Sequence, residues 1–371
     1  MVEGITIEIQ KILNLLAIYP YVDEFSEYKS YPKWLIIITL GVLSFLHGLH
    51  SCYWSFIYLC HFESTFTSIT KCLYDIHYDL ISIIRGLVVL FMFDWAALDN
   101  HVSITQKVWL KMDQKSHEFI IKSRRFKLIV MTFSSLNDLI WTLVGAYLFP
   151  TDSEDFKDRP SIYKYVIAVC EFVTVMGWLF MLNMISEICI NLQAMFAMIN
   201  QKLTDHPFNI DHLTDQIKIY RSYYSLTIRA TQSAETFLCY YLTIVYIEFI
   251  YSNLVNNIFN LASPTNSLAD SLQILCYNLS TTTYLFYLTY NLIKVNYFSH
   301  KGSEDLYELS LLTDDNQCKQ EIELFLYRMS KKDVGFTFSK LFVITPNFIT
   351  SLFTLALTLI LASPSFKLNP D

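Results

Sequence analysis

Residues 163–185 read YKYVIAVCEFVTVMGWLFMLNMI, in which Lys164 and Glu171 are the only charged side chains. A mostly apolar run of this length is sufficient for a helix to cross a bilayer core of about 30 Å. Apolar residues then continue at helical spacing from Glu187 to Leu203, and Pro207 is the first residue that breaks the pattern. The sequence therefore predicts one helix that spans a membrane and continues beyond it.

The same hydropathy recurs along the chain. Hydrophobic residues make up 53% of it, charged residues 16%, and the mean hydropathy is +0.34, values typical of a membrane protein rather than a soluble domain. We expect an all-α, seven-transmembrane helix bundle over residues 34–363. Its predicted spans are 36–58, 76–97, 127–149, 163–185, 237–259, 271–293 and 342–363.

Basic residues are distributed unequally between the two sides of this topology. Of the 27 Lys and Arg residues, 21 fall in the N-terminal tail and in the second, fourth and sixth connections. Because basic residues resist translocation, that side is predicted to be cytoplasmic. The tail 1–33 is then cytoplasmic and the tail 364–371 extracellular, which excludes the G-protein-coupled receptors, whose orientation is the reverse.

The connections on the basic side have helical patterns. Residues 213–236 lead into the fifth span without a breaker, and Thr313–Asn316 separates helical segments at 306–310 and 320–329. The extensions 187–236 and 294–341 are therefore expected to form a packed cytoplasmic bundle. They show no catalytic constellation, and the cysteines have no metal-binding spacing, so we expect no enzymatic activity, no cofactor, no bound metal and no nucleic-acid partner.

The last span differs from the others. Pro346 lies just inside its start and favours a break from the preceding segment. Hydroxyl side chains then recur at helical spacing, and with one leucine they form a single stripe: Ser351, Thr354, Thr358, Leu361 and Ser365. The stripe is consistent with a water-lined face, and equally with a seam of small residues that lets two helices pack closely.

Ionisable residues inside spans are expensive and mark functional sites by default. Arg85, Glu171 and Glu248 fall at depths where they could meet, whereas Asp94 and Asp138 lie elsewhere in their spans. One interpretation is a polar ligand cleft with aromatic walls, and the other is an internal Arg–Glu pair that only holds helices together. The candidate ligand-binding residues are Arg85, Trp141, Tyr147, Glu171, Glu248, Tyr251, Tyr277, Asn278 and Tyr284.

The long fourth helix resembles that of the insect gustatory receptors, which are relatives of the insect odorant receptors. The family pattern there is Leu, then Phe, then Leu/Ile-Asn, then Leu, and the matching residues are Leu192, Phe196, Ile199-Asn200 and Leu203.

The C-terminal end carries a second, incomplete resemblance. The family ends its seventh helix with Thr-Tyr, five apolar residues and Gln-Phe. Here Thr358 and Phe366 stand at that separation, but Leu359 replaces the Tyr and Ser365 replaces the Gln. These substitutions put in doubt the polar contacts that the family makes at the two positions.

The resemblance implies a ligand-gated cation channel in the plasma membrane, assembled as a homotetramer or as a heteromer with related receptors. It implies that the seventh helices line one pore for Na⁺, K⁺ and Ca²⁺, which favours the water-lined interpretation of the stripe. We therefore predict a gustatory receptor, surrounded by membrane lipid, that opens on binding a small tastant such as a sugar or a bitter compound. An odorant receptor subunit is the alternative with the same architecture. A transporter is a less favoured alternative, because the halves show no internal repeat.

Overall fold

The structure, a computed structural model, describes residues 33–61, 80–148, 161–205, 213–262, 268–331 and 333–362. These segments are mostly helical. In chain order they form α2 (Lys33–His61), a helix over Leu80–Phe91, α4 (Trp95–Trp109), α5 (Gln114–Leu148), α6 (Ser161–Asp205), α7 (Leu213–Ala262), α8 (Leu268–His300), α9 (Ser303–Leu312), α10 (Asn316–Ser330) and α11 (Pro346–Ala362).

Two helices are much longer than a membrane is thick. Helix α6 has 45 residues and α7 has 50, so at 1.5 Å per residue they extend about 70 and 75 Å, more than twice the bilayer core. The predicted continuation of the helix from residue 187 to 203 is confirmed, as is the continuous helix from residue 213 into the fifth predicted span.

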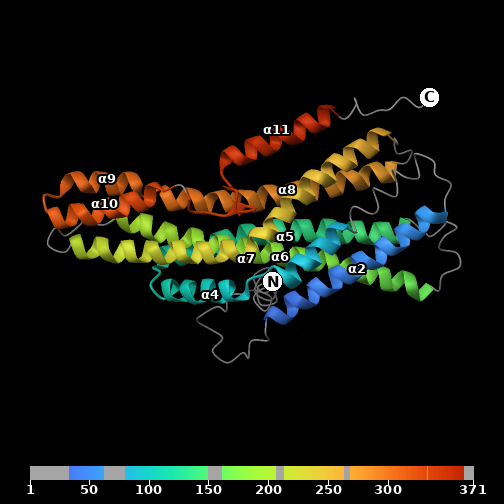
Figure 1. Cartoon of the computed structure of the whole chain (residues 1–371), viewed down its shortest axis with the longest axis horizontal. Helices are drawn as coiled ribbons and strands as arrows, with labels where there is room; N and C mark the ends of the chain where they lie inside the picture. Colours follow the sequence, from blue (N-terminus) through green and yellow to red (C-terminus); the bar gives the residue numbers. More distant parts are fainter. Residues whose placement is uncertain are drawn as a thin grey trace, which may run out of the picture.

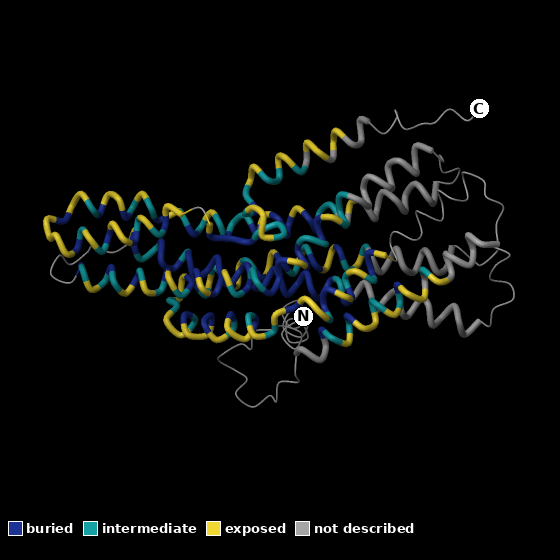
Figure 2. Tube along the Cα trace, viewed as in Figure 1, coloured by how far each residue is buried: buried dark blue, intermediate teal, exposed yellow. Residues whose placement is uncertain are grey.

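The long helices α5, α6, α7 and α8 run along the longest axis of the molecule, α9 and α10 lie at one end, and α4 packs against α7 (Figure 1). Helix α6 lies at the centre, and almost all its residues from 177 to 203 are buried (Figure 2). Large aromatic side chains fill the space around it, among them Phe196, Tyr224, Phe237 and Phe325. The bundle core is therefore aromatic as well as aliphatic.

The second predicted span, 76–97, does not form one straight helix. The helix over Leu80–Phe91 ends there, and α4 departs from it at an angle of 69°. Asp94, which the sequence analysis placed inside the span, instead caps α4 by accepting a hydrogen bond from the Ala97 N–H at 3.0 Å. An aspartate at this position satisfies an amide that the first helical turn leaves unpaired, which favours a new helix start.

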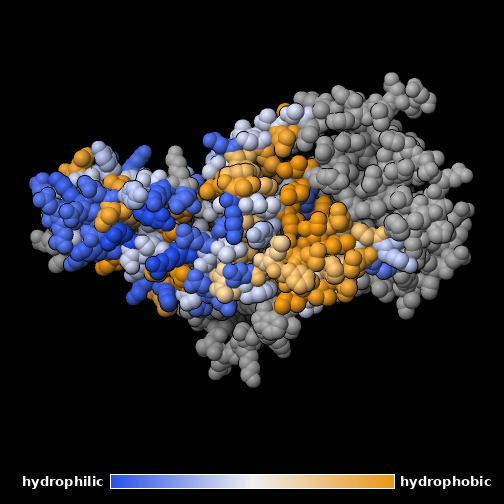
Figure 3. Space-filling model, viewed as in Figure 1, coloured by the Kyte–Doolittle hydropathy of each residue, from blue (hydrophilic) through white to orange (hydrophobic). Residues whose placement is uncertain are grey.

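Apolar helices long enough to cross a membrane occur at Gly177–Thr204 and Leu213–Ile250 within the described residues, and the bent pair 80–91 and α4 makes a third if it is one span. The number of spans and the placement of the termini remain predictions. A band of hydrophobic surface lies over the middle of the molecule, and the end formed by α9 and α10 is mainly hydrophilic (Figure 3).

A small β-hairpin precedes the last helix. Strands β1 (Thr337–Phe338) and β2 (Phe342–Val343) pair antiparallel, and the connecting residues Ser339 and Lys340 have φ values of 52° and 60°. Such left-handed conformations are uncommon outside glycine and suit a tight hairpin connection. In the described part of the chain this hairpin is the one departure from the all-α prediction. Helix α11 begins at Pro346, where the sequence predicted a break. The seventh predicted span was wrong at its start, because residues 342 and 343 form β2 instead of helix.

Candidate functional site

Arg85 and Glu248 form an ion pair within the helix bundle. The Arg85 Nη2 donates to Glu248 Oε1 at 2.9 Å, and the two side chains are 15% and 12% exposed. Two other buried polar atoms of the pair, Arg85 Nε and Glu248 Oε2, have no hydrogen-bond partner among the described residues. Because polar atoms withdrawn from water are costly when unpaired, this pair retains capacity for a further polar group.

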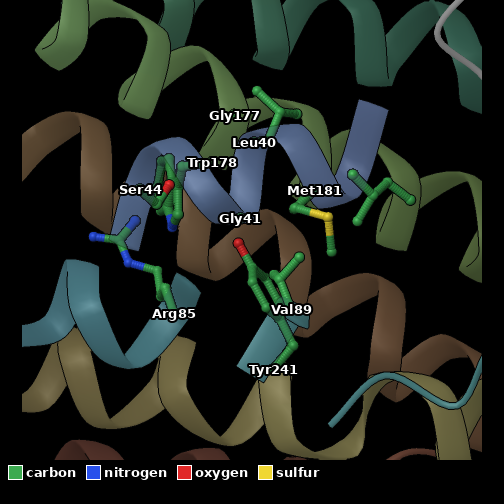
Figure 4. Close-up of a pocket in the computed structure, with 10 residues that line it drawn as sticks. Leu40, Gly41, Ser44, Arg85, Val89, Gly177, Trp178, Met181 and Tyr241 are labelled. Atoms are coloured by element: carbon green, nitrogen blue, oxygen red, sulfur yellow. The ribbon is translucent and has the colours of Figure 1, made fainter. Parts of the chain in front are cut away.

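Arg85 also lines a small cavity between α2, the helix 80–91, α6 and α7. Its volume is about 20 Å³, which is room for about one water molecule. Figure 4 shows Arg85 and Tyr241 extending from two of these helices toward Ser44 and Trp178 on the others. The indole Nε1 of Trp178 is buried and has no partner in the described part of the structure. Polar groups from four helices thus converge on one small, partly open cavity.

Glycines allow the helices around the cavity to approach closely. A Cβ at Gly86 would lie 2.8 Å from the Gly41 carbonyl oxygen, and one at Gly41 would lie 2.7 Å from Cγ1 of Val89. A Cβ at Gly177 would lie 3.2 Å from a methyl group of Leu40. Pockets that enclose a small organic ligand usually have volumes of about 300–1,000 Å³. The cavity is therefore too small for such a ligand in this conformation, and the helices around it would need to move apart to admit one.

The structure locates only part of the predicted ligand cleft. It brings Arg85 and Glu248 together, and it buries Tyr284 with its ring centre 5.1 Å from that of Trp178. Trp178 and Tyr241 line the cavity but were not predicted, although both are aromatic residues in predicted spans. The other candidates have side chains outside the described residues: Trp141, Tyr147, Glu171, Tyr251, Tyr277 and Asn278.

Four of the five predicted pore residues lie on α11, which leaves the bundle and stands apart from it (Figures 1 and 2). Ser351, Thr354 and Thr358 are exposed, but Leu355 and Leu357 on other faces are also about half exposed, so a single chain does not separate the stripe from the rest of the helix. The side chain of Leu361 and all of Ser365 lie outside the described residues.

The threonine hydroxyls of the stripe bond within their own helix. Thr354 donates to the Thr350 carbonyl at 2.8 Å, and Thr358 donates to the Thr354 carbonyl at 2.7 Å. This local bonding satisfies the hydroxyl protons on an apolar helix and leaves the oxygens able to accept further hydrogen bonds.

The β-hairpin connects α7 to α11. On the α7 side, Thr243 accepts a hydrogen bond from the Ser339 N–H at 2.9 Å, and Glu235 accepts one from the Thr337 hydroxyl. On the α11 side, the hairpin rings Phe338 and Phe342 contact Phe348, whose centre lies 5.8 and 5.3 Å from theirs. The hairpin thus contacts both the helix that carries Glu248 and the first turn of the candidate pore helix.

Glu187 is a second buried carboxylate, which the sequence analysis did not single out. It forms ion pairs with Arg124, at 2.9 Å, and with Lys127, and all three side chains are less than 10% exposed. One carboxylate therefore faces two cations between α5 and α6. Glu187 follows the fourth predicted span, and the two cations lie at or just before the start of the third, but no spacing along the chain pairs them.

Comparisons with known proteins identify the fold through solved structures and not through the sequence. No protein-family model matches the sequence, and no curated protein matches it. The structure is similar to that of the insect olfactory receptor OR5 from Machilis hrabei, with a TM-score of 0.57 and 13% identity over 97% of this chain and 98% of that one. It is equally similar to the same receptor in complex with eugenol, with a TM-score of 0.57 and 14% identity over 96% and 97%.

A similarity over nearly the full length of both chains shows that this protein has the fold of a membrane receptor. More particularly, the fold is that of an insect olfactory receptor.

Proposed function

We propose that the chain is a subunit of a chemosensory, ligand-gated cation channel in the plasma membrane. The observation that carries this proposal is α11, an apolar helix with hydroxyl side chains that leaves the bundle instead of packing into it. Lipid can cover its apolar faces, but its hydroxyl stripe is best accommodated around a shared water-filled axis. The shared fold with an olfactory receptor supports the same conclusion.

We place the ligand site at the cavity beside Arg85 and Glu248, and we place the N-terminus in the cytoplasm and the C-terminus outside, with seven spans. Unpaired polar atoms and aromatic walls suit a small molecule with both polar and apolar surface. One of the similar structures holds eugenol, a small molecule of this kind. Binding would enlarge the cavity, displace α7, and act on α11 through the β-hairpin.

The sequence resemblance favours a gustatory role with a sugar or bitter tastant, whereas the structural similarity to OR5 favours an odorant role. Both roles use the same architecture, whether as a homotetramer or as a heteromer with related receptors. Neither role requires an enzymatic activity, and we propose none.

Patch-clamp recording tests the proposal directly. The full chain, expressed alone and together with a related receptor subunit, is exposed to eugenol and to a panel of sugars and bitter compounds. We expect a ligand-dependent cation current with unitary channel openings. A surface-expressed chain that passes no current under any of these conditions, or one that shows slow, saturable substrate uptake, would contradict the channel function and favour a transporter.

A further inference from the structure

The exposed face of α5 changes abruptly from basic to apolar. Lys122 and Arg125 are exposed, and the exposed side chains from 126 to 136 are uncharged. Four of them are large and apolar and are 49–66% exposed, namely Phe126, Ile129, Phe133 and Leu136, and the fifth is Thr132. Ten residues of helix from Phe126 to Leu136 rise about 15 Å, which is half of a bilayer core. The apolar part therefore matches the depth of one leaflet, and the basic part lies where lipid headgroups begin.

Helix α8 shows the same change beside it. Leu279, Phe286 and Tyr290 are about half exposed, and one turn further Lys294 places its Nζ 4.4 Å from the centre of the Tyr290 ring. A basic residue beside an exposed tyrosine is typical of the interface between membrane and water.

Two ring contacts fix how α5 and α8 align. The Phe126 ring lies 5.8 Å from that of Tyr287, and the Phe119 ring lies 5.9 Å from that of Phe298. Residue numbers rise along one helix as they fall along the other, so the helices are antiparallel. Lys122 lies between the two contacts on α5, as Lys294 does on α8, and both lysines are therefore at about the same depth.

The charge around this level is unbalanced. Beneath it, Glu187 is shared by the buried Arg124 and Lys127, so that cluster already carries one excess positive charge. Lys122, Arg125 and Lys294 form no ion pair within the described residues. Glu118, the acidic side chain one turn before Lys122, is hydrogen-bonded to Gln114 at 3.0 Å. That hydrogen bond comes from a neutral amide and leaves Glu118 charged, so Lys122, Arg125 and Lys294 outnumber the one neighbouring carboxylate on α5.

We propose that the surface formed by α5 and α8 binds an anionic phospholipid. The phosphate and acidic headgroup lie at Lys122, Arg125 and Lys294, and the acyl chains lie along Phe126, Ile129 and Phe133. With the orientation given under the proposed function, on which this inference rests, the lipid belongs to the cytoplasmic leaflet, which is the leaflet that carries acidic lipids.

The test uses the purified full chain in detergent, with phosphatidylserine or phosphatidylcholine of identical acyl chains added. Native mass spectrometry counts bound lipid, and thermal unfolding measures stabilisation. We expect phosphatidylserine to bind more tightly, and the triple variant Lys122→Gln, Arg125→Gln, Lys294→Gln to lose about fivefold in affinity per removed cation. The matched control Lys107→Gln, Lys218→Gln, Lys319→Gln removes the same charge elsewhere and should retain the preference.

A soluble headgroup, glycerophosphoserine, should not stabilise the protein, because the acyl chains supply part of the binding. Equal binding of the two lipids, or an equal loss in both triple variants, overturns the proposal. A triple variant that keeps its lipid but changes its oligomeric state also overturns it, because the surface would then contact a second copy of the chain. None of these readouts needs current, so a failure of channel function is distinguished from a failure of lipid binding.

Discussion

Arg85 and Glu248 are 163 residues apart in the sequence, yet their side chains meet at 2.9 Å between the helix 80–91 and α7. The pair joins two helices that border the same cavity, and each partner keeps a polar atom unpaired within the described structure. An ion pair in this position can hold the helices together and also interact with whatever enters between them. The two roles make different predictions.

Glu248→Gln should weaken the ligand response without lowering the amount of protein at the cell surface. The substitution leaves the Arg85 guanidinium without its counter-charge, and because the pair retains some exposure, the cost stays below the roughly 3–5 kcal/mol of a fully buried pair. Dose–response currents combined with surface biotinylation provide the measurement. Glu321→Gln is the matched control, because it removes a 2.9 Å ion pair with Arg221 far along α7. A response that falls only in proportion to surface protein would favour the purely structural role.

Gly86→Ala should destabilise the bundle by overpacking, at a cost of about 1–3 kcal/mol. The new Cβ would meet the backbone oxygen of Gly41, which cannot move independently of α2. Gly177→Ala is the comparison, since its Cβ would lie 3.2 Å from a methyl group of the half-buried Leu40, a side-chain end that can shift by a few tenths of an ångström. Thermal unfolding in detergent should rank Gly86→Ala as the less stable variant, and the reverse order would show that the packing of α2 tolerates displacement.

Single cysteine substitutions along α11 should show which face of the helix is accessible to water. In a shared pore, a water-soluble thiol reagent blocks current at positions 351, 354, 358 and 365, and reacts little at 352, 355 and 359. In the single chain Leu355 is as accessible as the hydroxyl stripe, so a periodic pattern would arise from assembly. A flat profile, or one that peaks on the leucine face, would make the stripe a packing seam.

An epitope tag after Asp371 should be stained on intact cells, because the excess of basic residues assigns the opposite side to the cytoplasm. Staining that requires permeabilisation would reverse the orientation. It would also move the proposed lipid site to the outer leaflet, where acidic lipids are scarce.

Local patterns in the sequence predicted the helices well. Hydropathy and helical spacing are local properties, so the unbroken runs of α6 and α7 and the break at Pro346 could be inferred. The 69° turn after Phe91 was missed because the surrounding residues remain apolar. In retrospect Asp94 carried the signal, since aspartate is favoured at the first position of a new helix.

The residues of the candidate site were harder to predict from local sequence patterns. Depth in the membrane was sufficient to suggest that Arg85 and Glu248 could meet. The sequence does not give the rotation of each helix about its own axis. This rotation decides which side chains face the cavity, and it places Trp178 and Tyr241 there. Glu187 was missed for the same reason, because its partners lie on a different helix and no spacing along the chain connects them.

The continuity of α7 has a mechanical consequence. Tyr241, which lines the cavity, and Thr243, which accepts a hydrogen bond from the hairpin, lie on one unbroken helix, and such a helix rotates about its axis as a rigid body. With side chains reaching about 5–6 Å from that axis, a roll of about 20° moves their tips by roughly 2 Å. A ligand that rotates α7 about its axis would therefore displace the hairpin, and the hairpin would displace the first turn of α11 through its contacts with Phe348. In such a channel, agonists and antagonists of similar size would contact opposite sides of α7 and would therefore rotate it in opposite directions.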